Sequence, residues 1–231
     1  MNRPRRKIVV VIPAYNEAAM VGDVIASVPR SIDDMAVLCL VVDDGSTDNT
    51  ADVARSHGAI TLRHIVNLGV GAATRTGLRA AREFDPDVVV TIDADGQHDP
   101  AEIASLVRCL LANKYDVVIG SRIHLKGMPA LRIVANLFLN AVMFVVYRKV
   151  VSDSQSGFKA FNRRSLDIIE LDSAGYEICS EIIGEIVRNQ LSYKSLPVTA
   201  VYTQYSQAKG QPFLNGINLI LNLFERMLRR V

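Results

Sequence analysis

The chain of 231 residues has few cysteines, and their arrangement excludes two kinds of site. Cys39, Cys109 and Cys179 lie far apart and form no CxxC pair. An odd number of cysteines without such a pair excludes a disulfide framework and a zinc site made of thiolates. Reduced cysteines are typical of a reducing compartment, so we expect a cytoplasmic protein.

The sequence also lacks an excess of one charge. It contains 26 Lys and Arg against 24 Asp and Glu, which gives a formal net charge of +2. Proteins that bind nucleic acids usually have a clear basic excess, so we expect no nucleic-acid partner. A phosphate-binding GxxxxGK[ST] loop is missing as well, which excludes a P-loop enzyme.

Long apolar runs are absent too, although 49% of the residues are apolar and the mean hydropathy is +0.20. No window reaches the roughly 18 apolar residues that a transmembrane helix needs. The apolar run after Lys7 is only Ile8–Ile12 before a proline, which is too short for a secretory signal. We therefore expect neither a membrane span nor a signal peptide.

What the sequence does contain is a regular alternation of two patterns. Short β-branched runs begin 29, 23, 28 and 29 residues apart, and stretches with helical periodicity lie between them. This alternation predicts an α/β fold with a mostly parallel, Rossmann-like sheet and helices on both faces. The expected strands are 8–12, 37–42, 60–64, 88–92 and 117–119, and the expected helices are 21–28, 50–56, 72–83 and 103–111.

After Ser121 the rhythm changes. We expect an apolar helix over 131–150, a polar turn, a short strand over 158–161, a helix over 177–189, a strand pair over 193–202 and a last helix over 213–230. These elements predict a single domain over residues 1–231. Its first half, 1–122, is expected to bind a nucleotide, and its second half, 123–231, is expected to bind the acceptor.

Acidic residues follow several of the expected strands. Asp43 and Asp44 follow the second strand, and Asp93, Asp95 and Gln97 follow the fourth. Ligands of open parallel sheets bind at this edge, where clustered carboxylates need a cation or a bound sugar to compensate them. Oxygen ligands suit Mg²⁺ or Mn²⁺, although each acidic pair could instead form turns and cap helices.

A glycine-rich segment, residues 67–77, opens the expected third helix. Backbone N–H groups at the start of a helix can face a ligand. Glycines there can equally serve close packing of the helix. Both interpretations stay open at this point.

Six segments together resemble the family 2 glycosyltransferases of GT-A fold. They are VVIPAYNE, VVDDGSTDNT, NLGVGAATRTG, TIDADGQHDP, GSR and SDSQSGFKAF, in the order and spacing of that family. The resemblance runs from about residue 8 to about residue 201. DADGQH and SGFKAF resemble the branch that contains dolichol-phosphate mannose synthases and polyprenyl-phosphate relatives.

The resemblance implies a role for particular residues. The cation that bridges the diphosphate would be held by Asp93, Asp95 and Gln97. The acceptor phosphate would meet Arg122, assisted by Arg132, and Asp153 would lie on the acceptor side, so that Asp95, Arg122 and Asp153 form the catalytic set. The nucleotide sugar would contact Pro13, Tyr15, Glu17, Asp44, Asn67, Gly71, Asp93, Ala94 and Lys209. One departure concerns a compact loop after the final strands, where relatives usually carry a basic residue. Here the loop 205–209 offers only Lys209 for closing on the diphosphate.

The implied activity is that of an inverting, metal-dependent hexosyltransferase. It would move a hexose from GDP-mannose or a UDP-sugar to a polyprenyl or dolichyl phosphate at the cytoplasmic membrane face, with Mg²⁺ or Mn²⁺. The alternatives are a hydroxyl-acceptor glycosyltransferase of cell-wall or polysaccharide synthesis, with Glu181 as a possible base, and a non-catalytic sugar-nucleotide-binding subunit. The intact Asp-x-Asp motif argues against the second alternative.

Two expected helices carry a narrow polar stripe on an apolar cylinder. In the first, Arg132, Asn136 and Asn140 are four residues apart, and in the second the stripe runs from Asn215 to Arg229. Such helices suit the interface of a membrane, with the terminal arginines near anionic headgroups. We therefore expect a peripheral membrane protein, or else core or dimer helices, with a homo-oligomer or a membrane subunit as a further partner.

Overall fold

The computed structural model describes residues 6–122 and 153–200. Two expected helices, 131–150 and 213–230, lie outside the described residues. The same is true of Arg132 and Lys209. In the described part, no helix has the length and apolar character needed to cross a membrane.

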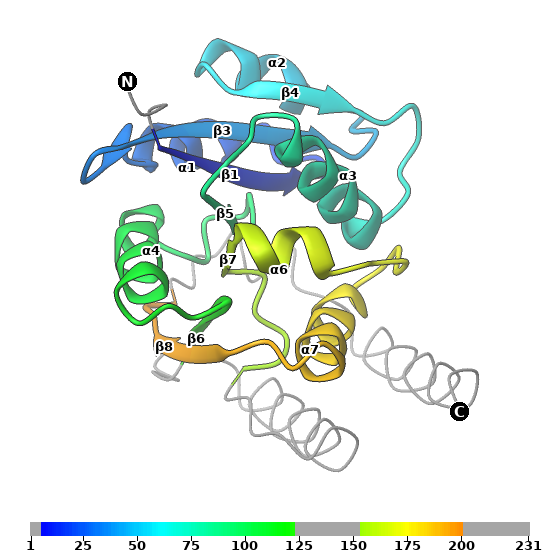
Figure 1. Cartoon of the computed structure of the whole chain (residues 1–231). Coiled ribbons are helices and arrows are strands. Elements are labelled where there is room, and N and C mark those ends of the chain that lie inside the picture. Colours follow the sequence, from blue (N-terminus) through cyan, green and yellow to red (C-terminus); the bar gives the residue numbers. More distant parts are fainter. Residues whose placement is uncertain (1–5, 123–152, 201–231) are drawn as a thin grey trace.

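Within residues 6–122 and 153–200, eight strands form one sheet, and helices pack on it (Figure 1). The strands are β1 (Lys7–Ala14), β2 (Ser31–Ile32), β3 (Met35–Asp43), β4 (Ile60–Arg63), β5 (Val88–Thr91), β6 (Val117–Ser121), β7 (Lys159–Asn162) and β8 (Tyr193–Pro197). The helices are α1 (Val21–Ser27), α2 (Thr50–Ser56), α3 (Val70–Arg82), α4 (Ile103–Ala112), α6 (Arg163–Ile168) and α7 (Ile178–Arg188), with a 3₁₀ turn η1 (Pro100–Glu102).

The sheet has the order β2-β3-β1-β5-β7-β6-β8, and β4 also pairs with β3. The pairs β1–β3, β1–β5, β3–β4 and β6–β8 are parallel, as the sequence pattern predicts. The two-residue β2 is antiparallel to β3, and β7, which lies between β5 and β6, is antiparallel to both of them. A strand of the expected acceptor half is therefore inserted into the sheet of the expected nucleotide half.

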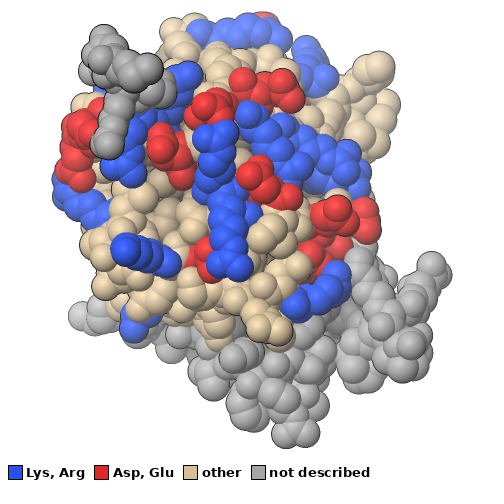
Figure 2. Space-filling model, in the orientation of Figure 1, with Lys and Arg blue, Asp and Glu red and all other residues tan. Residues whose placement is uncertain are grey.

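The sheet is buried on both faces. Along β1, Ile8 and Val10 belong to one apolar cluster, which includes side chains of α1 and α4. Val9 and Val11 belong to the other, which includes side chains of α3, α6 and α7. Successive residues of a strand point to opposite faces, so a run of consecutive apolar residues supplies both cores. On the face of the molecule drawn in Figure 2, acidic and basic side chains lie interspersed among the other residues.

The sequence pattern located most of these elements within two or three residues. The helix expected over 72–83 occupies Val70–Arg82, and the strand expected over 158–161 occupies Lys159–Asn162. β2 and α6 were not expected, because a two-residue strand and a six-residue helix are too short for a periodic pattern. Of the strand pair expected over 193–202, the structure describes β8 and an isolated bridge between His98 and Ala200.

Candidate active site

The expected cation ligands follow β5, at the carboxyl edge of the sheet. The side-chain amide of Gln97 donates a hydrogen bond of 2.8 Å to Asp95 Oδ2, and its backbone N–H donates one of 3.0 Å to Oδ1. Gly96, between them, has a φ of 71°, which lets the chain turn back so that both bonds form. This local turn holds Asp95 and Gln97 beside each other.

Asp93 lies among like charges. Burial and the neighbouring charges of Asp95 and Glu17 raise the pKa of Asp93 to about 6, against the opposing charges of Arg122 and Lys159. Carboxylates that raise one another's pKa in this way are relieved when a cation binds between them. The electrostatics of this edge therefore suit a bound cation.

The residues present fit Mg²⁺ or Mn²⁺. The protein would supply the carboxylates of Asp93 and Asp95 and the Gln97 amide, and among the described residues no group of three or more His, Cys, Asp and Glu side chains is placed to hold a metal. Hard cations of this kind accept such partial protein coordination and take substrate phosphates at their other positions. The backbone at Gly157 also lies close to the Asp93 carboxylate, because a Cβ added at Gly157 would lie 2.5 Å from both carboxylate oxygens.

Arg122 and Asp153, both expected in the site, form a buried ion pair. Nε and Nη2 of Arg122 lie 2.6 and 3.0 Å from the two carboxylate oxygens, and the Arg122 backbone N–H lies 3.3 Å from Oδ2. The side chains are 14% and 5% exposed. Although burial acts against it, the hydrogen bonds and charge of Arg122 hold the pKa of Asp153 below its usual value. The resemblance implied both residues but did not imply that they pair.

Two residues in this region were missed by the sequence analysis. Lys159 is 1% exposed, and its Nζ donates a hydrogen bond to the backbone carbonyl of Ser156. His98 is 2% exposed, and burial together with the charges of Arg122 and Lys159 lowers its pKa to about 3, so the ring is neutral. The signal for Lys159 is a lysine within the apolar strand FKAF, since a buried lysine needs a partner.

Polar atoms without a hydrogen-bond partner lie next to these residues. Among the described residues, Nδ1 of His98 and Oγ of Ser121 are buried and have no partner. Ser121 directly precedes Arg122, and the His98 ring packs against Phe158 with 5.2 Å between centroids. Buried polar groups without a partner are rare and call for a partner such as a ligand or a water molecule.

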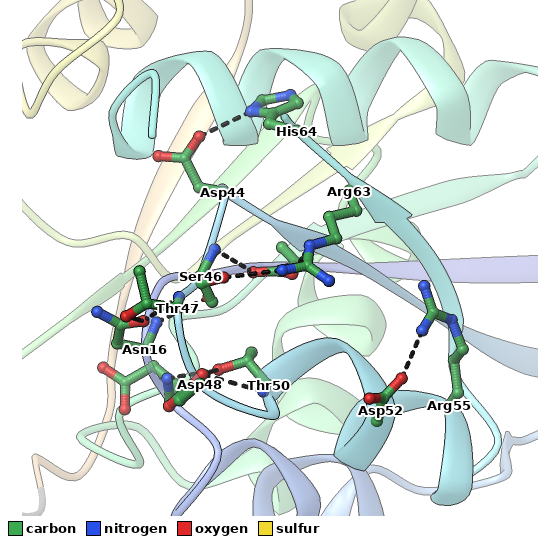
Figure 3. A network of polar contacts seen from close by, with 12 residues as sticks. Asn16, Asp44, Ser46, Thr47, Asp48, Thr50, Asp52, Arg55, Arg63 and His64 are labelled. Carbon is green, nitrogen blue, oxygen red and sulfur yellow. Dashed lines mark hydrogen bonds and ion pairs between the residues drawn. The ribbon is translucent and has the colours of Figure 1, made fainter. Parts of the chain in front are cut away.

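On the other side of the site, Asp44 organises the loop between β4 and α3. Its carboxylate accepts hydrogen bonds from the backbone N–H groups of Leu68 (3.0 Å) and Gly69 (2.8 Å). It also lies 2.7 Å from Nδ1 of His64, which is drawn in Figure 3. Contact between Asp44 and the base or ribose stays a prediction. In the structure Asp44 holds the loop that carries Asn67.

The loops after β1 and β3 are tied together (Figure 3). The backbone N–H of Asn16 donates to Ser46 Oγ (2.9 Å), and the Asn16 side-chain oxygen accepts from the Thr47 backbone (2.8 Å). The Glu17 backbone donates to Thr50 Oγ1 (2.8 Å). These bonds fix the position of Glu17, which is 8% exposed, next to Tyr15, which is 44% exposed.

The glycines that open α3 pack against another segment. A Cβ at Gly71 would lie 2.6 Å from the carbonyl oxygen of Gly175, and one at Gly69, where φ is 97°, would lie 2.4 Å from that of Ala174. The structure therefore supports the packing interpretation of these glycines. Donor contact at Gly71 stays a prediction, as it does for Pro13 and Ala94, which are buried at the ends of their strands.

Glu181, the possible base of the hydroxyl-acceptor alternative, is 6% exposed. Its carboxylate accepts hydrogen bonds from the backbone N–H groups of Asp172 (3.2 Å) and Ser173 (2.8 Å). These bonds hold the segment before α7 in place. Glu181 therefore has a structural role that explains its presence in the sequence.

The model of one protein family, "Glycosyl transferase family 2", matches residues 9–169 of this chain. The match contains the loops after β1, β3 and β5, the Arg122–Asp153 pair and β7.

Two relatives are similar over nearly their whole length. The UDP-N-acetylglucosamine–dolichyl-phosphate N-acetylglucosaminyltransferase of Methanococcus voltae is 34% identical over 247 residues, which cover 97% of this chain and 97% of that protein. The polyprenol monophosphomannose synthase of Mycolicibacterium smegmatis is 28% identical, with 96% of this chain and 86% of that protein covered.

Among solved structures, glucosyl-3-phosphoglycerate synthase from Mycobacterium tuberculosis, in complex with Mn²⁺, UDP-glucose and phosphoglyceric acid, has the same fold. The TM-score is 0.74 at 22% identity, and the match covers 96% of this chain and 79% of that one. At this identity the likeness concerns the fold, and it agrees with the expected GT-A architecture.

Proposed function

Because the chain belongs to glycosyl transferase family 2, we propose that it transfers a hexose or N-acetylhexosamine from a nucleoside diphosphate sugar to a polyprenyl or dolichyl phosphate. The family assignment makes the chain a glycosyltransferase. The choice of acceptor is supported by the two relatives described above, whose names state dolichyl phosphate and polyprenol as the lipids they use. The sugar and the nucleotide differ between these relatives, so the donor is proposed only as a class.

One observation carries the choice of a phosphate acceptor. The guanidinium of Arg122 is held by Asp153 within electrostatic reach of Asp93, so a cationic group lies beside the candidate metal site. A phosphate monoester has a second pKa near 6 and is largely a dianion at neutral pH. Such a nucleophile is already deprotonated, and it needs a positioned cation more than it needs a general base.

The residues of this chain would act as follows. Asp153 fixes the guanidinium plane of Arg122, which can then receive phosphate oxygens with the geometry that arginine favours. His98, neutral and buried, and Ser121 offer further polar atoms beside that position. The phosphate oxygen would attack the anomeric carbon, and the nucleoside diphosphate would leave from the opposite side, which inverts the configuration.

Asp93, Asp95 and Gln97 would hold a Mg²⁺ or Mn²⁺ ion. When bound, such an ion supplies positive charge that stabilises the departing diphosphate. The loops after β1 and β3 would hold the nucleotide, with Tyr15 and Glu17 at the base and ribose. Metal dependence of this chain is part of the proposal.

We place the enzyme at the cytoplasmic face of a membrane, since its acceptor would be a lipid. The helices expected over 131–150 and 213–230 would lie in the interface. Sedimentation with anionic liposomes, with and without residues 211–231, tests this placement. Binding of the full chain that is lost on truncation supports it, and a full chain that stays in the supernatant at low salt contradicts it.

The transfer reaction is tested with a panel of radiolabelled nucleotide sugars, Mn²⁺, and either polyprenyl phosphate or the dephosphorylated polyprenol. We expect label in the lipid phase only with the phosphate. Equal transfer to the polyprenol would contradict the proposal and favour a hydroxyl acceptor.

A further inference from the structure

We propose that the turn Ser156–Lys159, which enters β7, is a positioning element for the cation site, with Gly157 setting the place of the Asp93 carboxylate and Lys159 acting as its resident counter-charge. The inference rests on the proposed function, because the cation is the one that the transferase would use. It concerns two residues for which the sequence analysis implied no role.

The contact between Gly157 and Asp93 supports the first part. Both carboxylate oxygens of Asp93 lie 2.5 Å from the place where a Cβ at Gly157 would be. Gly157 does not have a positive φ, so glycine is not required there by the backbone conformation. Its lack of a side chain is explained by the space that the carboxylate occupies.

The pairing of β7 with β5 places this turn. Thr91, two residues before Asp93, is opposite Lys159 in the antiparallel register. The Thr91 hydroxyl donates a hydrogen bond of 2.7 Å to the carbonyl of Gly157. The turn and the first metal ligand are therefore attached to the same position of the sheet, and they cannot move independently.

The second part of the proposal is the counter-charge of Lys159. Its side chain is fully buried on the sheet face covered by α7, where its charge acts on Asp93 and Asp153. Charged groups that act on Asp93 or Asp153 include the carboxyls Glu17 and Asp95 and the cations Arg122 and Lys159. Together with Asp93 and Asp153, these groups hold four carboxylates against two cations when ionised, an excess of two negative charges that a divalent cation would neutralise.

Arg122 is paired with Asp153, and both Arg122 and Lys159 lower the pKa of Asp93, so Lys159 is a second cation that offsets the carboxylates after β5. A buried positive charge there stabilises the empty site, because clustered carboxylates without a counter-charge are unfavourable. The same charge repels an incoming metal ion. The two residues of one turn are therefore expected to have opposite effects on metal affinity.

The experiment measures Mn²⁺ binding by electron paramagnetic resonance at about pH 8, where carboxyl groups are ionised. The probes are Mn²⁺ alone and Mn²⁺ with uridine diphosphate, and no acceptor or transfer is involved. For Gly157→Ala we expect binding at least about tenfold weaker, since the carboxylate must move. For Lys159→Gln, which keeps a hydrogen-bond donor but removes the charge, we expect binding about three- to tenfold tighter.

Matched controls separate these effects on metal binding from general effects of a substitution on the fold. Gly22→Ala also places a Cβ against a side chain, 2.8 Å from the His57 ring, but it lies on α1. Lys194→Gln removes an exposed lysine from β8. Both controls should bind Mn²⁺ as the unmodified protein does. If Lys159→Gln does not fold, Lys159→Met takes its place, because methionine fills buried space of similar length.

Weaker binding by both turn variants would overturn the role of Lys159 and reduce the turn to structural support. Unchanged binding by both would overturn the whole inference. If the unmodified protein binds no Mn²⁺, the proposed cation site fails first. Failure of the lipid-phosphate assay alone leaves the Mn²⁺ result unaffected.

Discussion

On the proposed donor side of the site, the loops after β1 and β3 are joined by hydrogen bonds between uncharged groups and by one from the Ala18 backbone to the Asp48 carboxylate, whereas a buried ion pair lies on the proposed acceptor side. Asn16, Ser46 and Thr47 satisfy one another across the two donor loops. Arg122 and Asp153 form an ion pair on the proposed acceptor side, and the buried Lys159 donates a hydrogen bond to the Ser156 carbonyl, next to polar atoms of His98 and Ser121 that have no partner among the described residues. The proposed donor loops are held mainly by hydrogen bonds to one another, whereas the proposed acceptor side depends on one buried ion pair.

This difference has a physical consequence for mutations. Neutral hydrogen bonds contribute about 1 kcal/mol each, so the donor loops should tolerate single losses. Breaking a buried ion pair leaves a charge without compensation, which destabilises by about 3–5 kcal/mol. Substitutions should therefore have larger effects at the charged side than at the donor loops, and the following predictions test this order.

The largest effect on transfer is expected at Asp95, in the proposed cation site between the two sides. Asp95→Asn should reduce transfer by at least about 1,000-fold, because the proposed metal ion, which would stabilise the departing diphosphate, would lose a charged ligand. The Gln97 hydrogen bonds to Asp95 are partly kept by asparagine, so the thermal midpoint should change little. The measurement is transfer rate at saturating Mn²⁺, together with circular dichroism. Full activity of carefully stripped enzyme in EDTA would show that the metal assignment is wrong.

The next effect is on the acceptor side. Arg122→Lys should raise the KM for polyprenyl phosphate by about tenfold or more and leave the KM for the nucleotide sugar within about twofold, since lysine cannot reproduce the planar fork held by Asp153. Steady-state kinetics with each substrate varied in turn provide the measurement. Arg108→Lys, at an exposed pair with Asp33, is the matched control. An equal rise of both KM values would place Arg122 in the donor site or in the fold.

A smaller effect is expected in the donor loops. Asn16 has a φ of 53°, so Asn16→Gly removes the side-chain bond to Thr47 without adding backbone strain. We expect the KM for the nucleotide sugar to rise about three- to tenfold, with unfolding easier by about 1 kcal/mol. Asn16→Asp keeps the acceptor oxygen and should restore most of the affinity. A change confined to the lipid substrate would contradict the division into two sides.

The sequence pattern was sufficient for the strands and helices whose apolar residues repeat regularly, and for the acidic loops that follow them. It was not sufficient for the place of β7, because nothing in FKAF indicates that this strand enters the sheet antiparallel between β5 and β6. The pairing of Arg122 with Asp153, 31 residues away, follows from that insertion. The same holds for Lys159, whose burial beside Asp93 depends on the register of β7 with β5.

The smallest effect on transfer is expected far from both sides, at the amino end of β6. Asp116 accepts hydrogen bonds from the backbone and hydroxyl of Ser192 (2.8 and 2.9 Å) and from the Asn162 amide (3.0 Å). Although burial acts against them, these bonds and the charge of Arg164 lower its pKa. A carboxyl whose pKa is lower in the folded state stabilises the fold above its unfolded pKa of about 3.9, and this contribution is lost as the pH falls through the folded value.

Asp116→Asn should therefore remove part of the acid-induced loss of stability, while the free energy of unfolding at pH 7 falls by about 1–2 kcal/mol. Urea unfolding of both proteins between about pH 3 and pH 7 measures this difference. Because Asp116 ties β6, β7 and β8 together at the edge opposite the site, the KM values for donor and acceptor should not change. If Asp116→Asn instead alters the KM for the lipid phosphate, then the charged side of the site extends through β6 as far as Asp116.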